Sequence, residues 1–271
     1  MIRAAVIQLR SGVTVQENLE AATTLIRQAA IDGAEFIATP EMTHILQRSP
    51  KRLFDSITDE SNDLGVKHFA ALADELSIDL LIGSLAIKTG EKRAVNRSYL
   101  FGKDGVLKAR YDKIHLFDVT VSRAETWKES NVYDRGETAV MSEIDGATLG
   151  LSICYDLRFA PLYKHYARSG AQILTVPAAF TRPTGEAHWE SLLRARAIET
   201  SSFVIAPAQG GTHEDGRSTW GRSMIIGPWG DIRAILDHDV PGYICADLDM
   251  TDVTSARSKI PAWDYQPDYE S

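Results

Sequence analysis

The first forty residues constrain the fold most strongly, because they read as a strand, a helix and a second strand in immediate succession. Residues Ile2 to Leu9 form an apolar run of strand length, and residues Ala34 to Thr39 form another. Between these runs, apolar side chains recur at helical spacing from Leu19 to Ala30, and Gly33 stands where a glycine commonly ends a helix. Parallel strands joined by a helix are the unit of α/β folds. The chain is therefore predicted to be an α/β protein.

The same alternation of elements continues through the chain. Its 271 residues approach the size at which one hydrophobic core stops growing, and no linker, repeat or low-complexity segment divides them. We therefore expect a single domain over residues 1–271. Residues 118–138 are polar and irregular, which predicts a long loop of the kind that often carries function. Further strands are expected at 80–87, 95–101, 106–111, 172–176 and 203–208, and further helices at 67–76, 159–168 and 186–200.

Charge and composition exclude several classes of protein. The chain carries 29 Lys and Arg against 37 Asp and Glu, so its net charge is −8, and neither a nucleic acid nor a membrane surface is indicated as a partner. Two cysteines are too few for a disulfide scaffold. No apolar run reaches the length of a membrane-spanning helix, and the N-terminal run is too short for a signal peptide. These observations predict a cytoplasmic protein.

Searches for common cofactor and metal motifs are negative. The sequence contains no GxGxxG, GxxxxGK[ST], HExxH, CxxC or GxSxG pattern, so neither a nucleotide-phosphate cradle nor a structural zinc site is indicated. Glu41 and His44 form one isolated E-x-x-H pair, whereas a carboxylate-bridged di-metal site needs two such pairs. We therefore expect no metal site.

Three reactive residue types follow three of the predicted strands. Glu41 follows the AEFIAT strand after one proline, Lys113 follows VLKARY after one aspartate, and Cys154 ends the strand LGLSIC. The carboxyl ends of strands in an open α/β sheet form the edge at which ligands bind. A carboxylate, an ammonium group and a thiol at that edge would supply a base, an anion stabiliser and a nucleophile.

Each of these residues also has a plainer interpretation. A lone cysteine in an apolar strand is usually a packing residue, and Cys245 is interpreted in that way. Glu41 alone would be a carboxylate at the start of a helix, and Lys113 alone would be a solvated side chain. A Cys–His hydrolase also remains open, with His115 or His188 as the base. The residues by themselves therefore leave the nucleophile and its base open.

Four motifs occur along the chain, AAVIQL, TPEM, YDKIHLFDV and LGLSICYDLRF. Taken in their order and spacing, they resemble the nitrilase superfamily of carbon–nitrogen hydrolases over essentially the whole chain. The resemblance implies a four-layer α-β-β-α sandwich and a catalytic triad formed by Glu41, Lys113 and Cys154. It also implies a second glutamate between the lysine and the cysteine in the chain. Glu129 matches that position, and Glu125 is the nearby alternative.

Later motifs favour one branch of this superfamily. AHWESLLRARAIET, APAQGG and STWGRSMIIGPWG resemble the branch that contains deaminated glutathione amidase and omega-amidase. This likeness implies cleavage of an amide in a small carboxylate-bearing substrate, such as deaminated glutathione or 2-oxoglutaramate, through a thioester and without a metal or organic cofactor. The backbone N–H of Tyr155 would join the lysine in stabilising the oxyanion. The residues expected to line the substrate pocket are Arg158, Phe180, Thr181, Arg182, His188, Trp189 and Arg194.

Other readings of the same resemblance lead to different functions. Another branch of the superfamily would make the protein an N-carbamoyl amino-acid amidohydrolase or a true nitrilase. A catalytically silent binding or scaffold member is the non-enzyme alternative, and the intact triad argues against it. Members of the superfamily usually dimerise, so a homodimer or a higher homo-oligomer is expected. The C-terminal residues, from about 250 to 271, would form an arm at the dimer interface.

Overall fold

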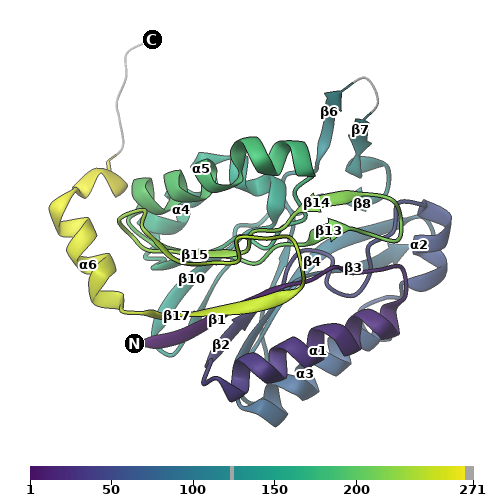
Figure 1. Ribbon diagram of the computed structural model, residues 1–271, viewed down its shortest axis with the longest axis horizontal. Coiled ribbons are helices and arrows are strands. Elements are labelled where there is room, and N and C mark those ends of the chain that lie inside the picture. The colour runs from purple at the N-terminus through teal and green to yellow at the C-terminus, as the bar shows by residue number, and fades with distance from the viewer. Residues whose placement is uncertain (123–124, 266–271) are drawn as a thin grey trace.

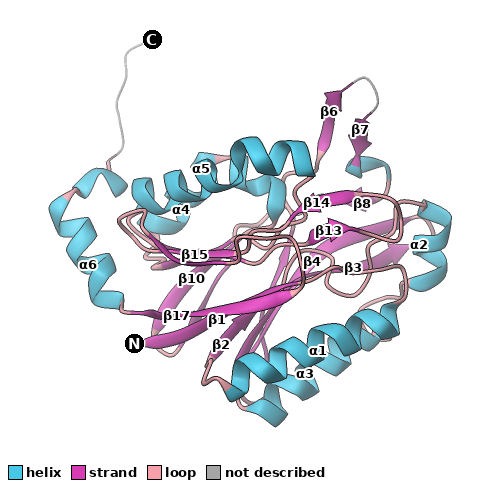
Figure 2. Ribbon diagram, in the orientation of Figure 1, coloured by secondary structure: helices cyan, strands magenta, loops and turns pink. Residues whose placement is uncertain are grey.

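Two β-sheets lie face to face, and helices cover the outer face of each sheet (Figure 1). The computed structural model describes residues 1–122 and 125–265. Figure 2 shows the strands in the middle of the molecule, with helices on both sides of them. This architecture confirms the predicted α/β class and the four-layer α-β-β-α sandwich. Within the described residues, no helix has both the length and the apolar character needed to span a membrane.

The first sheet has seven strands and contains the predicted strand–helix–strand unit. Strands β1 and β2 pair in parallel, and so do β2 and β3, whereas the remaining pairs along the sheet are antiparallel except for β8, which runs parallel to β4. In spatial order the strands are β17 (Gly242–Leu248), β1 (Ile2–Gln8), β2 (Phe36–Ala38), β3 (Asp79–Gly90), β4 (Arg93–Phe101) and β5 (Leu107–Asp112), with β8 (Tyr133–Asp134) beside β4.

The second sheet has six strands and packs against the first. Strands β10, β11 and β12 run parallel to one another, and antiparallel strands lie on either side of them. In spatial order the strands are β16 (Ile232–Ile235), β15 (Met224–Ile226), β12 (Phe203–Ala206), β11 (Ile173–Thr175), β10 (Ala147–Leu151) and β9 (Met141–Ile144). Two separate hairpins pair β6 (Asp118–Ser122) with β7 (Glu125–Lys128) and β13 (Gly210–Thr212) with β14 (Ser218–Trp220).

The helices form the two outer layers. Helices α1 (Val15–Ile31) and α3 (Leu64–Leu76) cover the first sheet, and α4 (Ala160–Arg168) and α5 (Arg182–Thr200) cover the second (Figure 1). Gly33, with a φ of 86°, follows the C-terminus of α1 in the left-handed conformation predicted for it. The remaining helices are α2 (Pro50–Ser56), α6 (Met250–Lys259) and the 3-10 helices η1 (Glu129–Asn131), η2 (Cys154–Arg158) and η3 (Pro261–Trp263).

Strand β1 shows why the sequence contains continuous apolar runs. Ala4 and Val6 belong to the core between the two sheets, whereas Ala5 and Ile7 belong to the core beneath α1 and α3. All four side chains are fully buried. A strand covered on both faces loses the polar–apolar alternation of a half-exposed strand. The apolar runs of the sequence therefore mark the central strands of both sheets.

Two parts of the chain differ from the sequence-based expectation. The segment 118–138, predicted to be irregular, contains the hairpin β6–β7, the short helix η1 and strand β8. These elements are too short and too polar to give a periodic signal. Helix α5 begins at Arg182 rather than near residue 186, because Pro183 lies in its first turn, where a missing N–H costs no hydrogen bond.

The described part of the C-terminal segment packs on its own chain. Helix α6 leads into η3, where the Arg257 guanidinium lies 4.5 Å from the centroid of the Trp263 ring. Lys164 Nζ of α4 donates to the carbonyl of Ala262 at 2.9 Å. Residues 266–271 of the predicted arm lie outside the described residues. Its role in a dimer interface stays a prediction.

Candidate active site

The three reactive residues singled out in the sequence meet between the two sheets. Glu41 follows β2 of the first sheet, Lys113 follows β5 of the same sheet, and Cys154 follows β10 of the second sheet. We expected them along one edge of one open sheet, and this part of the prediction is wrong. Each residue does follow the carboxyl end of a strand, but two facing sheets contribute them. The site therefore depends on the packing of the sandwich.

Glu41 is held in a tight turn after β2. Met42, the next residue, has a φ of 56°, and its N–H donates to Ser84 Oγ at 2.9 Å. The carbonyl of Glu41 accepts a hydrogen bond from Gln209 Nε2 at 3.0 Å. A left-handed conformation is costly for a residue other than glycine and persists only where its surroundings fix it. These contacts turn the carboxylate of Glu41, which is 5% exposed, toward the space between the sheets.

Lys113 lies between two carboxylates. Its Nζ is 2.8 Å from Glu41 Oε1 and 2.9 Å from Glu129 Oε2. The lysine is 2% exposed, and a buried ammonium group is tolerated only where opposite charges and hydrogen bonds replace water. Burial opposes the charged form, but Glu129 and Glu41 outweigh it and raise the pKa of Lys113 well above its ordinary value. The lysine is therefore a fixed positive charge in the site.

Among the described residues, Glu129 is the second glutamate of this cluster. Its Oε2 accepts the N–H of Phe117 at 2.6 Å, and both of its oxygens lie within 3.1 Å of Lys113 Nζ. The side chain of Glu125 lies outside the described residues. Helix η1, immediately after the β6–β7 hairpin, brings Glu129 to the lysine. The position predicted from the motif spacing is thus the one that meets Lys113.

Asn96 of β4 connects the two carboxylates and was not found from the sequence. Its Nδ2 donates to Glu41 Oε1 at 2.8 Å and to Glu129 Oε1 at 3.2 Å. The side chain is fully buried. An asparagine at a buried position of a strand is a signal for such a role, because a buried amide needs hydrogen-bond partners.

Cys154 lies at a sharp change of direction between β10 and η2. Its φ of 49° is left-handed, and its N–H donates to the carbonyl of Pro177 at 2.9 Å. Asp156 stabilises the turn, because its Oδ2 accepts the N–H of Ile153 at 2.8 Å. The side chain of Cys154 is 7% exposed and is hydrogen-bonded to the carboxylate of Glu41. The nucleophile candidate and the base candidate are therefore in contact.

The resting protonation states of this pair follow from burial and from the neighbouring charges. Burial and the charge of Glu41 raise the pKa of Cys154 well above its ordinary value, although Lys113 opposes them. Burial also disfavours the charged form of Glu41, but Lys113 and the surrounding hydrogen bonds outweigh it and lower the pKa of that carboxylate. The cluster already contains two negative charges and one positive charge, so a thiolate would add a further negative charge. The resting site therefore pairs a neutral thiol with an ionised carboxylate.

The two histidines of the Cys–His alternative lie elsewhere. His115 Nδ1 is 2.7 Å from Asp156 Oδ1, and its ring stacks on Phe159 with centroids 3.6 Å apart. His188 is exposed on α5 and contacts Arg158 at 3.3 Å. Among the described residues, the lining of the pocket at Cys154 includes no histidine. The geometry therefore favours Glu41 as the base.

The isolated E-x-x-H pair does not converge. His44 is buried beside Asp63, with 3.7 Å between His44 Nε2 and Asp63 Oδ2, whereas Glu41 turns toward Lys113. In the described ranges, no group of three or more His, Cys, Asp and Glu side chains is arranged to hold a metal ion.

Gly83 of β3 allows the segments that carry Glu41 and Cys154 to approach each other. A Cβ at this position would lie 2.0 Å from the carbonyl oxygen of Thr39 and 2.3 Å from Cβ of Pro177. Thr39 leads into the Glu41 turn, and Pro177 accepts the N–H of Cys154. The two facing segments thus meet where this strand has no side chain.

We expect Gly83→Ala to lower the free energy of unfolding by about 3 kcal/mol or more, the upper part of the range for overpacking, because backbone atoms must move. Activity should fall with it, because the same segments position the reactive groups. Gly90→Ala, in the same strand, is the matched control, since its nearest neighbouring atom would be 3.9 Å away. Urea unfolding of both variants measures the difference. Equal stabilities would contradict this role for Gly83.

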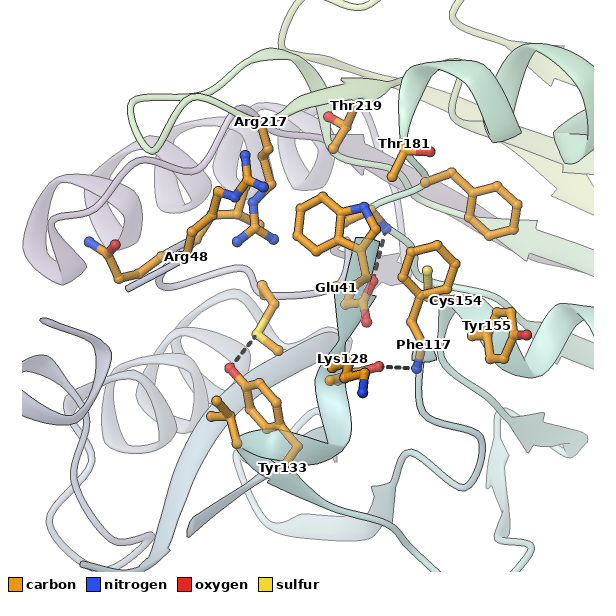
Figure 3. A pocket seen from close by; sticks show the side chains of 18 of the residues that line it. Glu41, Arg48, Phe117, Lys128, Tyr133, Cys154, Tyr155, Thr181, Arg217 and Thr219 are labelled. Carbon is orange, nitrogen blue, oxygen red and sulfur yellow. Dashed lines mark hydrogen bonds between the residues drawn. The ribbon is translucent and has the colours of Figure 1, made fainter. Parts of the chain in front are cut away.

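Cys154, Glu41 and Lys113 open into one cavity of about 470 Å³ (Figure 3). Its lining includes five cationic side chains and two acidic ones among the described residues. The cationic residues are Arg48, Lys113, Lys128, Arg158 and Arg217, and the acidic residues are Glu41 and Glu129. A pocket with this excess of positive charge, in a chain of net charge −8, is suited to an anionic ligand.

Three of the seven predicted lining residues line this cavity. Arg158, Phe180 and Thr181 do so, and the Arg158 guanidinium lies 5.8 Å from the Tyr155 ring centroid and 5.3 Å from that of Phe180. Residues of other segments complete the lining and were not found from the sequence. They include Arg48, Trp127, Tyr133 and Arg217.

The other four predicted lining residues belong to α5 but not to the pocket, and this part of the prediction is wrong. Arg182 pairs with Asp239 at 2.5 Å, and Arg194 Nε donates to the carbonyl of Gly230 at 2.9 Å. His188 is exposed, and its Nδ1 lies 3.3 Å from Arg158 Nη1. Trp189 is buried in the core, and its Nε1 donates to the carbonyl of Arg222 at 2.9 Å.

Comparison with known proteins agrees with this geometry. The sequence profile of the carbon–nitrogen hydrolases matches residues 3–258. The deaminated glutathione amidase of Synechocystis is 38% identical over 263 residues, which is 96% of each chain. The human omega-amidase NIT2 is 33% identical, over 96% of this chain and 93% of that protein.

Solved structures show the same relationship. The crystal structure of the C. elegans NitFhit protein superposes with a TM-score of 0.91 at 32% identity; it covers 98% of this chain, which spans only 65% of that protein. Nit3 of Saccharomyces cerevisiae, a member of branch 10 of the nitrilase superfamily, superposes with a TM-score of 0.86 at 26% identity, over 96% of this chain and 94% of its own. The resemblance read from the sequence motifs is confirmed, and the chain belongs to the carbon–nitrogen hydrolase family.

Proposed function

We propose that the protein is a cysteine-dependent amidase that hydrolyses the amide of a small carboxylate-bearing substrate through a thioester on Cys154. The substrates that fit this proposal are deaminated glutathione and omega-amides such as 2-oxoglutaramate. One observation carries it. A thiol in contact with the Glu41–Lys113–Glu129 cluster lies in a cavity whose lining is predominantly cationic. The names of the two relatives described above support the same substrate class.

In the acylation step, the proton of the Cys154 thiol passes to Glu41 as the sulfur attacks the amide carbon. The neutral thiol and the ionised carboxylate make this transfer concerted with attack, so no free thiolate has to form beforehand. Glu41 then gives the same proton to the nitrogen, the C–N bond breaks, and the amine or ammonia leaves. A correctly placed acid–base group contributes typically about 10²–10⁴-fold to the rate.

The oxyanion of the tetrahedral intermediate is stabilised by Lys113 and by the backbone N–H of Tyr155. Tyr155 lies in the first turn of η2, directly after the nucleophile. Lys113 contributes a fixed positive charge that needs no reorganisation during the reaction. Loss of one such donor typically costs about 2.7–4 kcal/mol.

Deacylation reverses these roles. Glu41 takes a proton from water, the hydroxide attacks the thioester carbon, the C–S bond breaks, and the departing sulfur recovers the proton. The net reaction is amide plus water to carboxylic acid plus amine. Glu129 and Asn96 act as positioning residues, because they hold Lys113 and Glu41 in place through contacts of 2.8–3.2 Å.

The pH dependence of kcat/KM distinguishes a carboxylate base from an imidazole base. The pKa of Glu41 lies below 4.5, the ordinary value of a glutamate side chain. Its carboxylate therefore stays ionised at every pH above 4.5. We therefore expect the acidic limb of kcat/KM to fall below pH 4.5, where protons reach the base. Circular dichroism at each pH, with a return to pH 7 before reassay, separates titration from unfolding. An acidic limb near pH 6.5 with an intact fold, the ordinary range of histidine, would contradict the proposal.

A substrate panel tests the proposed function as a whole. The enzyme is assayed for product amine or ammonia with 2-oxoglutaramate, deaminated glutathione, an N-carbamoyl amino acid and an aliphatic nitrile. We expect turnover of one or both amides at a kcat/KM at least about a hundredfold above that of the last two, the size of discrimination that a polar site can supply. Preference for the carbamoyl compound or the nitrile would place the protein in another branch of the family, and a wild-type protein inactive on all four would support a silent member.

A further inference from the structure

Two arginines flank one tryptophan ring at the edge of the cavity. The Arg48 guanidinium lies 4.7 Å from the ring centroid of Trp127, and that of Arg217 lies 5.2 Å from it. The three residues come from distant parts of the chain, since Arg48 precedes α2, Trp127 belongs to β7 and Arg217 precedes β14. All three line the same cavity as Cys154. Planar guanidinium groups on an aromatic face are held in orientation and keep their edge N–H groups available for an anion.

This cluster carries positive charge that the described chain does not fully neutralise. Arg217 pairs with the buried Asp215 at 2.8 Å, and its backbone N–H donates to the same carboxylate at 3.1 Å. Arg48 is exposed and has no ion pair with any described carboxylate. Two guanidinium groups beside one ring, of which only Arg217 is paired with a carboxylate, leave a net positive charge. An anionic group of a ligand would complete the arrangement.

The cavity therefore has two cationic ends. Figure 3 shows Arg48 and Arg217 on one side of the pocket and Cys154 with Tyr155 on the other, with Glu41 between them. Arg158 lies at the Cys154 end, over the ring of Tyr155. A substrate whose amide carbon is at Cys154 can therefore extend an anionic group toward either end.

Glu41 determines which half of the substrate faces which end. Under the proposed function, this residue gives its proton to the departing nitrogen. Figure 3 shows Glu41 between Cys154 and the two arginines, so we infer that the leaving amine points toward the arginines. Residues 41–48 run from Glu41 to Arg48 along the wall of the cavity. Tyr133 lines the same cavity, and the charges of both the Glu41–Lys113–Glu129 cluster and Arg217 act on its hydroxyl. The Arg48 end is therefore the leaving-group end.

We propose that Arg48 and Arg217, oriented by Trp127, bind a carboxylate carried by the leaving amine. This inference rests on the proposed function and narrows its substrate class to amides whose amine half is itself an acidic, peptide-like group. Deaminated glutathione releases such an amine, a dipeptide with a terminal carboxylate. A primary omega-amide releases ammonia and leaves this end of the cavity empty. The two substrate types should therefore respond differently to loss of Arg48.

The test compares three substrates that share the same acid half and differ in the amine half. They are 2-oxoglutaramate, deaminated glutathione, and deaminated glutathione whose terminal carboxylate is converted to a carboxamide. For the wild-type enzyme we expect kcat/KM to be about 10–100-fold higher for the free carboxylate than for the carboxamide, the effect of one charge-assisted hydrogen-bonded contact. Arg48→Gln should lower kcat/KM by about the same factor for deaminated glutathione and leave the other two amides within about threefold.

Two further variants isolate the cause. Arg52→Gln, an exposed position on α2 outside the lining, is the matched control for the general loss of a positive charge, and should change none of the three values. Arg217→Lys keeps the charge beside Asp215 but loses the planar edge, and should reproduce the selective loss. Thermal unfolding of each variant checks for a folding defect. If a variant unfolds below the assay temperature, Arg48→Lys replaces it. The same selective loss is expected for Arg48→Lys.

The outcomes separate the two proposals. A wild-type enzyme that treats the carboxylate and the carboxamide alike, or an Arg48→Gln variant that slows all three amides equally, would overturn the leaving-group subsite while amide hydrolysis stands. A wild-type enzyme that hydrolyses none of the three amides would overturn the proposed function itself. A loss confined to the substrate with the free carboxylate supports both.

Discussion

Replacing Cys154 with alanine is expected to lower kcat by on the order of 10⁶-fold, the effect of removing a covalent nucleophile. The substitution removes the one atom that forms the thioester, and no other described cysteine lines the cavity. The fold should persist, because alanine fits the space of the thiol and the backbone contact to Pro177 remains. Turnover of deaminated glutathione or 2-oxoglutaramate, measured beside urea unfolding, gives both quantities.

Cys245→Ala is the matched control. This second cysteine is half-buried in β17, and burial raises its pKa. The variant should keep most of the activity. Alkylation with iodoacetamide offers an independent check, since inactivation should follow modification of Cys154. Inactivation that instead follows modification of Cys245, or a Cys154→Ala variant with measurable turnover by the thioester route, would show that the nucleophile is wrongly assigned.

Local sequence patterns predicted the elements that contribute the reactive residues. Strands buried on both faces produce apolar runs, and Glu41 and Cys154 each follow such a strand. Lys113 follows β5, in which more buried and more exposed positions alternate. Residues that directly follow a strand can be recognised as candidates in the sequence, because the strand itself can be recognised there. Which of two sheets each strand joins is decided by pairing between distant segments. The patterns therefore identified the three residues but placed them wrongly along one sheet.

The lining of the cavity was much harder to predict, for two physical reasons. Arg48, Trp127 and Arg217 lie in connections and a short hairpin, where no period-2 or period-3.6 pattern marks the direction of a side chain. Arg182 and Arg194 were chosen for their closeness to a recognised motif. On a helix, however, closeness in sequence does not fix the face, and both side chains of α5 turn away from the cavity to pair elsewhere.

The protonation states were also beyond the sequence. A lysine near a cysteine suggests a thiolate, because a positive charge lowers a thiol pKa. In the folded protein Lys113 is already neutralised by Glu41 and Glu129, and the thiol is buried. The complete cluster is needed to see that burial and the charge of Glu41 outweigh Lys113 and raise the pKa of Cys154. The same cluster makes Glu41 the residue whose replacement separates the steps of the reaction.

Glu41→Gln should lower both acylation and deacylation by about 10²-fold or more, because glutamine has the shape of the base but accepts no proton at neutral pH. The lost negative charge also lowers the pKa of Cys154, since the charge of Glu41 raises it in the wild type. An aryl ester of 2-oxoglutarate, whose leaving group needs no proton, should therefore still acylate the thiol. Water then lacks a base, so the thioester should accumulate, and mass spectrometry should find the acyl group on the peptide that contains Cys154.

Glu129→Gln is the matched control for this trap. It removes the other carboxylate beside Lys113, at 2.9 Å, but leaves the base in contact with the thiol. Turnover should fall because the lysine is less well positioned, yet no thioester should accumulate, since Glu41 still activates water. If a histidine were the base, Glu41→Gln would retain near-normal turnover and trap nothing, whereas His115→Ala or His188→Ala would be severely impaired. An adduct in Glu41→Gln and none in Glu129→Gln would assign to Glu41 the proton transfers of both half-reactions.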